Sequence, residues 1–261
     1  MTVPFGLTLL TLGFAGAFVS GLVGAGGVII MIPLLYYGPP ALGVGMLRIS
    51  EVTGISMAQA FVATVSAILA HGRFGTVHRE LALVGGSTMA VGSLSGAIAS
   101  RYVDGWVLLL IFALVATSAL PLLFLPVAAL AREVPAAQVT IKRLLAGVVG
   151  GGAGVVAGLV GASGGFLLVP LFIVVLGVPV RVTIGTSLAV TAIASVGGFA
   201  GKLLTAQVPL WPTVFVLSGA IAGAQLGARM SQRVNTRVLR MFLALLIGLS
   251  ATRVWISVFS D

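Results

Sequence analysis

The chain is a succession of apolar runs separated by short polar connections. Most of the runs hold about 20 residues, which is the length that a helix needs to cross the hydrocarbon core of a bilayer. Two runs are divided by clustered glycines into a long part and a part of about half a span. The pattern predicts helices over 5–23, 28–37, 50–70, 81–100, 106–130, 144–160, 166–176, 185–204, 209–230 and 239–259. We expect Gly38-Pro39-Pro40 to stop the second of these helices.

The glycine-divided run occurs twice. Gly21-Leu-Val-Gly-Ala-Gly-Gly-Val-Ile-Ile-Met-Ile-Pro-Leu34 is repeated 137 positions later by Gly158-Leu-Val-Gly-Ala-Ser-Gly-Gly-Phe-Leu-Leu-Val-Pro-Leu171, with eight of fourteen residues identical. A helix that enters such a cluster loses side-chain packing and backbone restraint. We therefore expect a break in the helix at both places.

A second pair of matching segments extends the repeat. Gly54-Ile-Ser-Met-Ala58 matches Gly185-Thr-Ser-Leu-Ala189 at a separation of 131, so the first half has six extra residues (137 − 131), most simply around 38–47. The sequence predicts a first transmembrane repeat over 1–130, a charged linker over 131–143 and a second repeat over 144–261. Repeats of this kind are common in transporters, with the binding site between them.

Composition places these helices in a membrane. Hydrophobic residues make up 59% of the chain and charged residues 7%, against about 25% charged in soluble domains, and the mean hydropathy is +1.22. We expect an all-α polytopic membrane protein with the lipid bilayer as a partner. The net charge of +9 is dispersed among the loops, which argues against nucleic-acid binding.

The basic loop residues predict the orientation. If each glycine-divided segment crosses the membrane once, the two sides carry seven basic residues each, without the usual cytoplasmic excess. If each segment enters and returns as a hairpin, the count becomes ten to four, with Arg48, Arg101, Lys202 and Arg253 on the poorer side. We therefore expect returning hairpins, each followed by three membrane helices. The second half is then inverted relative to the first, and both termini are non-cytoplasmic.

The two breaks are candidate anion sites. The first amides of a helix lack partners within the helix and carry the positive end of its dipole. In a bilayer such a break survives only where protein or water receives the freed groups. The alternative is that the glycines only permit close helix packing. The candidate substrate-binding residues at the breaks are Gly24, Ala25, Gly26, Gly27, Gly161, Ser163, Gly164 and Gly165.

Neutral polar side chains on the next helix of each half are further candidates. Ser56 and Ser187 occupy equivalent positions, with Gln59 and Thr186 nearby. Taken singly, such residues often bond to carbonyls of their own helix. As a matched pair beside the breaks, they suit a desolvated anion that must also be released.

Four charged or titratable residues are candidates for coupling or gating: Glu51, His71, Arg73 and Lys202. The simpler interpretation of Glu51 is a solvated carboxylate at a helix start, and that of His71 and Arg73 is an interfacial position. Lys202 is equivalent to His71 by position.

The sequence lacks the residue patterns that enzyme catalysis usually requires. The five carboxylates are not paired on one helix, the two histidines show no metal-ligand spacing, and neither glycine cluster is followed by Lys-Ser or Lys-Thr. We expect no catalytic residue, no metal and no cofactor.

The repeated motifs resemble those of the sulfite exporter TauE/SafE family. The resemblance rests on Gly21–Gly27 with Pro33, on Gly158–Gly165 with Pro170, and on Gly185-Thr-Ser-Leu188, and it covers both halves in order. It implies a secondary transporter in the cell (inner) membrane that exports sulfite, a sulfonate or a similar small anion. The first half has Gly54-Ile-Ser where the second has Gly-Thr-Ser, so the two half-sites are expected to be unequal. The alternative function is a passive anion channel or a membrane partner protein. The sequence leaves open whether transport is coupled to a proton or another ion and whether the protein forms a homodimer.

Overall fold

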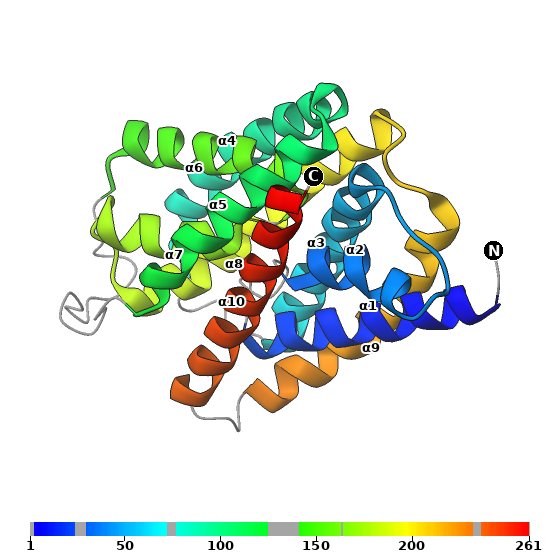
Figure 1. The fold of residues 1–261 in the computed structure, drawn as a ribbon. Helices are drawn as coiled ribbons and strands as arrows, with labels where there is room; N and C mark the ends of the chain where they lie inside the picture. Colours follow the sequence, from blue (N-terminus) through cyan, green and yellow to red (C-terminus); the bar gives the residue numbers. More distant parts are fainter. Residues whose placement is uncertain are drawn as a thin grey trace.

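The structure is a computed structural model that describes residues 3–23, 30–71, 77–124, 141–162, 164–231 and 236–260. All regular elements in these ranges are helices, which confirms the all-α prediction. They are α1 (Val3–Val23), α2 (Met31–Ala41), α3 (Ile49–His71), α4 (Arg79–Ala99), the 3-10 helix η3 (Ser100–Tyr102), α5 (Gly105–Phe124), α6 (Arg143–Val160), α7 (Gly165–Val174), α8 (Val180–Leu204), α9 (Leu210–Ser231) and α10 (Thr236–Ser260) (Figure 1).

One predicted boundary is wrong. Helix α2 does not stop at Gly38-Pro39-Pro40 but continues through both prolines to Ala41. A proline inside a helix removes the hydrogen bond that its own nitrogen would donate and crowds the carbonyl four residues earlier. Here the end of the helix is closed after the prolines, because the carbonyls of Gly38, Pro39 and Pro40 accept from the amides of Leu42, Val44 and Gly43.

Five helical segments are long and apolar enough to cross a membrane: Val3–Leu22, Arg79–Tyr102, Arg143–Val160, Gly185–Leu204 and Leu210–Met230. Shorter apolar segments lie in α5 and α10. The short helices α2 and α7 have 11 and 10 residues. At 1.5 Å per residue each is about 15 Å long, which is half of the hydrocarbon thickness.

Helix α2 turns back along α1. A Cβ added to Gly16 of α1 would collide with the Met31 side chain at the start of α2, and one added to Gly38 would lie 2.9 Å from Leu12. Farther along, Gly45 lies against Phe5 near the start of α1. The order of these contacts makes α1 and α2 an antiparallel hairpin, as the count of basic residues predicts.

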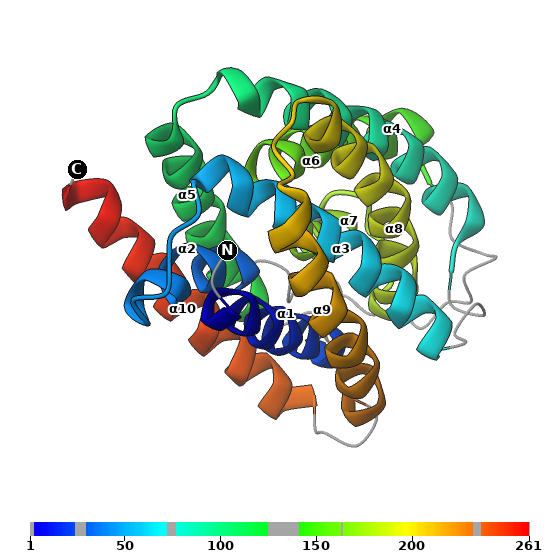
Figure 2. The same ribbon diagram turned by 90° about the vertical axis from the view of Figure 1, so that its right-hand side faces the viewer.

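The long helices exchange partners between the two expected halves. Helix α1 packs along α9, and α6 packs along α4, so the first long helix of each half lies against the fourth helix of the other (Figures 1 and 2). A Cβ on the glycines of these contacts would overlap backbone atoms of the facing helix. They are Gly13, Gly21, Gly219, Gly223 and Gly227 in the first pair and Gly92, Gly96, Gly150, Gly154 and Gly158 in the second.

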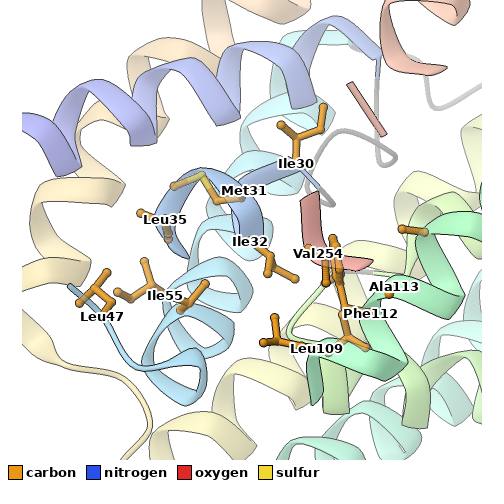
Figure 3. Close-up of a cluster of buried hydrophobic side chains, with 14 of the residues drawn as sticks. Ile30, Met31, Ile32, Leu35, Leu47, Ile55, Leu109, Phe112, Ala113 and Val254 are labelled. Atoms are coloured by element: carbon orange, nitrogen blue, oxygen red, sulfur yellow. The ribbon is translucent and has the colours of Figure 1, made fainter. Parts of the chain in front are cut away.

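The described residues form two large apolar clusters and a small one of Ala17, Ala63, Ala220 and Ala224. One large cluster contains Ile30, Met31 and Ile32 at the start of α2, together with Val160 and Ala162 at the end of α6. Figure 3 shows the α2 side chains of this cluster facing residues of α3, α5 and α10. Residues that flank the two glycine breaks therefore share one core. The other large cluster joins α4, α6, α7 and α8.

Candidate functional site

The second glycine cluster breaks the helix as predicted. Helix α6 ends at Val160, and Gly161 follows in the left-handed region with φ 79°. The amides of Gly161 and Ala162 both donate to the Ala157 carbonyl and close the end of the helix. Gly164, also left-handed at φ 64°, then precedes the start of α7.

The start of α7 has the features of an anion receptor. Gly164 provides no side-chain cap, and its carbonyl accepts from Leu167 and Leu168. The amides of Gly165 and Phe166 belong to the first turn and lack partners within the helix. Ser163 lies outside the described residues.

The first glycine cluster, with Gly24, Ala25, Gly26 and Gly27, lies outside the described residues. Helix α1 is described as far as Val23, and α2 begins at Met31. Pro33, in the first turn of α2, has no N–H of its own.

Two predicted polar residues on α3 are buried without partners. Ser56 and Gln59 are 0% exposed, and the Ser56 hydroxyl and both polar atoms of the Gln59 amide have no hydrogen-bond partner in the described part of the chain. A Cβ on Gly16 would lie 3.6 Å from Gln59 Nε2, and the same Cβ would collide with Met31. The Gln59 amide therefore lies near the end of the Met31 side chain, which extends from the first residue of α2. Leaving a buried polar group unpaired costs about 1–3 kcal/mol, so a ligand or water is expected to pair with these atoms.

The equivalent position in the second half is apolar. The repeat separation of 131 makes Val190 the counterpart of Gln59. The separation of 137, which holds around the glycine clusters, makes Ala153 and Leu168 the counterparts of Gly16 and Met31. Val190, Ala153 and Leu168 all belong to the second apolar cluster. The Gln59 amide therefore has no polar counterpart at the equivalent position of the second half.

The other predicted donors have structural partners. The Thr186 hydroxyl accepts a hydrogen bond of 3.0 Å from the main-chain N–H of His78, which joins α8 to the connection before α4. Ser187 is buried and engaged in an interaction. The buried Thr191 hydroxyl, one turn later, has no partner among the described residues.

Lys202 lies in a polar cluster that the sequence does not reveal. Its ammonium is fully buried and donates to Thr53 Oγ1 at 2.9 Å, Ser100 Oγ at 2.6 Å and Gln207 Oε1 at 3.1 Å. These acceptors come from α3, η3 and the connection after α8. Ser100 and Gln207 are 102 and 5 positions from Lys202, and no motif in the sequence relates them.

Of the other candidates for coupling, the structure places Glu51 outside this cluster. Glu51 accepts from the Arg48 guanidinium and main-chain N–H, both at 2.9 Å, at the start of α3. This hydrogen bond and the charge of Glu51 raise the pKa of Arg48. The His71 side chain and Arg73 lie outside the described residues.

Comparison with known protein families matches residues 9–254 to the family described as sulfite exporter TauE/SafE. The chain belongs to this family. As a TauE/SafE member with several apolar helices of membrane-spanning length, it is a multi-pass membrane protein of a transporter family. No curated protein and no solved structure matches the chain.

Proposed function

We propose that this TauE/SafE protein is a secondary transporter that exports sulfite, a sulfonate or a similar small sulfur-containing oxyanion across the inner cell membrane. The observation that carries the proposal is the Gln59 amide, which is fully buried near the Met31 side chain and has no hydrogen-bond partner among the described residues. Ser56, one turn earlier on α3, adds a second buried hydroxyl without a partner.

The donors gathered there suit an oxyanion. The Gln59 amide and the Ser56 hydroxyl supply side-chain N–H and O–H groups, and the first turn of α2 supplies main-chain N–H groups. The positive end of the helix dipole favours negative charge at the same point. Neutral donors and a half-helix start bind an anion without the strong retention that a buried arginine would impose.

The exchange of helix partners supports an inverted repeat. Packing of α1 on α9 and of α6 on α4 is the pattern that two equivalent halves produce around a two-fold axis. The antiparallel return of α2 along α1 agrees with the hairpin topology, in which that axis lies in the membrane plane. In this proposal, the halves rock against each other and expose the site alternately to the two sides.

The alternative is a passive channel or a partner protein in which the glycines serve packing alone. Packing does explain Gly21 and Gly158, because a Cβ on either would overlap a facing carbonyl. It leaves the unpartnered Gln59 amide unexplained.

The test is counterflow of radiolabelled sulfite into liposomes that contain the purified protein. The proposal predicts saturable uptake that is accelerated by unlabelled sulfite inside the vesicle. Gln59→Met keeps the side-chain volume but removes both polar atoms, and it should abolish this uptake. Flux without saturation, or flux unchanged in the variant, would contradict the proposal.

A further inference from the structure

The Lys202 cluster is arranged around an ammonium group. The hydroxyl of Thr53 donates its own hydrogen to the Ser50 carbonyl at 2.9 Å, and that of Ser100 lies 2.7 Å from the Ala97 carbonyl. Both hydroxyl oxygens therefore direct lone pairs toward Lys202 Nζ.

Gln207 completes the same pattern. Its amide nitrogen donates to the Ala97 carbonyl at 3.2 Å and to Thr205 Oγ1 at 2.7 Å, which leaves Oε1 facing Lys202. Three acceptors thus meet the three hydrogens of an ammonium group. The Ser100 hydroxyl also lies 3.1 Å from Gln207 Oε1, so the partners of Lys202 contact one another.

The charge of this ammonium has no acidic partner among the described residues. Glu51 is paired with Arg48 and Glu80 with Arg143, and Asp104 is exposed. The partners of Lys202 itself are two hydroxyls and one amide, all neutral. A buried charge normally requires a charge of opposite sign, because neutral dipoles offset only part of its desolvation.

Thr53 contacts both the Lys202 ammonium and the second glycine break. A Cβ on Gly161 would overlap the Thr53 carbonyl oxygen, and Thr53 Oγ1 is one of the three partners of Lys202. Ser56 and Gln59 follow Thr53 along α3 at steps of three residues, which rise about 4.5 Å each. The cation thus stands at one end of a row of polar side chains, and the unpaired Gln59 amide stands at the other.

We propose that Lys202 is the charge-selecting residue of the transporter, a fixed cation that draws an oxyanion toward the Gln59 amide along the polar row of α3 and supplies its countercharge. This inference rests on the proposed function and deepens it. It gives Lys202 an electrostatic role toward the substrate, in addition to the contacts that it makes between α3, η3 and α8.

Three variants separate charge from hydrogen bonding. Lys202→Arg keeps the charge with different geometry, Lys202→Gln keeps hydrogen-bond donors without the charge, and Ser100→Ala removes one partner without touching the charge. In sulfite counterflow, we expect Lys202→Gln to raise KM about tenfold or more with kcat changed less than threefold, because the variant removes the Coulomb attraction of a unit charge for the anion. Lys202→Arg and Ser100→Ala should stay within about threefold of the wild-type KM. Equal KM values for Lys202→Gln and the wild type would overturn the proposal and assign Lys202 a structural role.

Competition by other anions is a measurement that a purely structural role of Lys202 would leave unchanged. Sulfate carries two charges and methanesulfonate carries one, and Coulomb attraction scales with the product of charges. Lys202→Gln should therefore weaken the inhibition of sulfite uptake by sulfate more than the inhibition by methanesulfonate. Equal losses would contradict a charge-selecting role, whereas absence of saturable sulfite uptake by the wild-type protein would contradict the proposed function itself. Thermal unfolding of each variant in detergent identifies any loss of activity that comes from misfolding.

Discussion

The main-chain N–H of Gln207 donates to the Lys202 carbonyl at 3.0 Å, while Oε1 of the same glutamine accepts from Lys202 Nζ at 3.1 Å. Both links depend on the reversal of the chain at the end of α8. There the Ala206 N–H donates to the Leu203 carbonyl, and Ala206 adopts a left-handed conformation with φ 55°. This is the helix-end geometry that usually carries glycine. The turn therefore places Gln207 beside the buried ammonium at some cost in backbone strain.

Ala206→Gly should stabilise the protein. A left-handed alanine costs about 1–2 kcal/mol, and part of the gain is offset by the greater freedom of glycine in the unfolded chain, so we expect a net gain of about 0.5–1 kcal/mol. The measurement is the midpoint of thermal unfolding in detergent. Ala200→Gly, inside α8, is the matched control and should lower the midpoint. A lower midpoint for Ala206→Gly would show that the left-handed turn carries no strain.

Gln59→Met should raise stability while it removes function. The variant eliminates two buried polar atoms without partners, each worth about 1–3 kcal/mol of unfavourable desolvation in the ligand-free protein. We expect a higher unfolding midpoint and no further rise on addition of sulfite, whereas sulfite should raise the wild-type midpoint. Thr117→Val is the control, because its hydroxyl is already bonded to the Ala113 carbonyl. If Gln59→Met lowered the midpoint, the amide would have a structural partner and the site would be misplaced.

Gly161→Ala should be more damaging than Gly177→Ala. Both glycines are left-handed, with φ 79° and 65°, but a Cβ on Gly161 would overlap Thr53, and one on Gly177 would meet nothing within 4 Å. We expect about 1 kcal/mol of destabilisation at Gly177 and at least about 2–3 kcal/mol at Gly161. Unfolding midpoints of the two variants make the comparison. Equal losses would mean that backbone conformation alone, and not the close approach to α3, requires glycine at the break.

Gly223→Ala should separate α1 from α9. A Cβ at this position would overlap the Phe14 carbonyl oxygen, so the two helices must move apart at a cost of about 1–3 kcal/mol. Gly248→Ala, on α10 with nothing within 4 Å, should instead be neutral or stabilising by up to about 1 kcal/mol. A cysteine pair engineered between α1 and α9 would report the separation as slower disulfide formation. An unchanged rate together with an unchanged midpoint would contradict the packing described for this pair.

Much of the fold is predictable from the sequence because its main signals are local. The second glycine cluster interrupts the helix at Val160, and most described helix boundaries lie within a few residues of those that the apolar runs predict. The continuation of α2 through Pro39 and Pro40 is not predictable in this way. It depends on which later amides cap the freed carbonyls, and that is settled only by the path of the chain after Ala41.

The candidate site is only partly predictable. Ser56 and Gln59 stand out by their position in the repeat, and comparison of Gln59 with Val190 already suggests unequal half-sites. The partners of Lys202 could not be found, because Ser100 lies 102 positions away and is brought close only by the packing of α4 against α8. Likewise, the bond between Thr186 and the His78 amide is a tertiary contact with no local signature.

The most direct measurement is an experimental structure of the protein with selenite, which has the shape and charge of sulfite and a heavier central atom that is located without ambiguity. We predict selenite within hydrogen-bond distance of Gln59 Nε2 and of the first main-chain N–H groups of α2. Selenite elsewhere with the Gln59 amide bonded to protein, or closely packed apolar side chains where the anion should lie, would contradict an oxyanion site at this break.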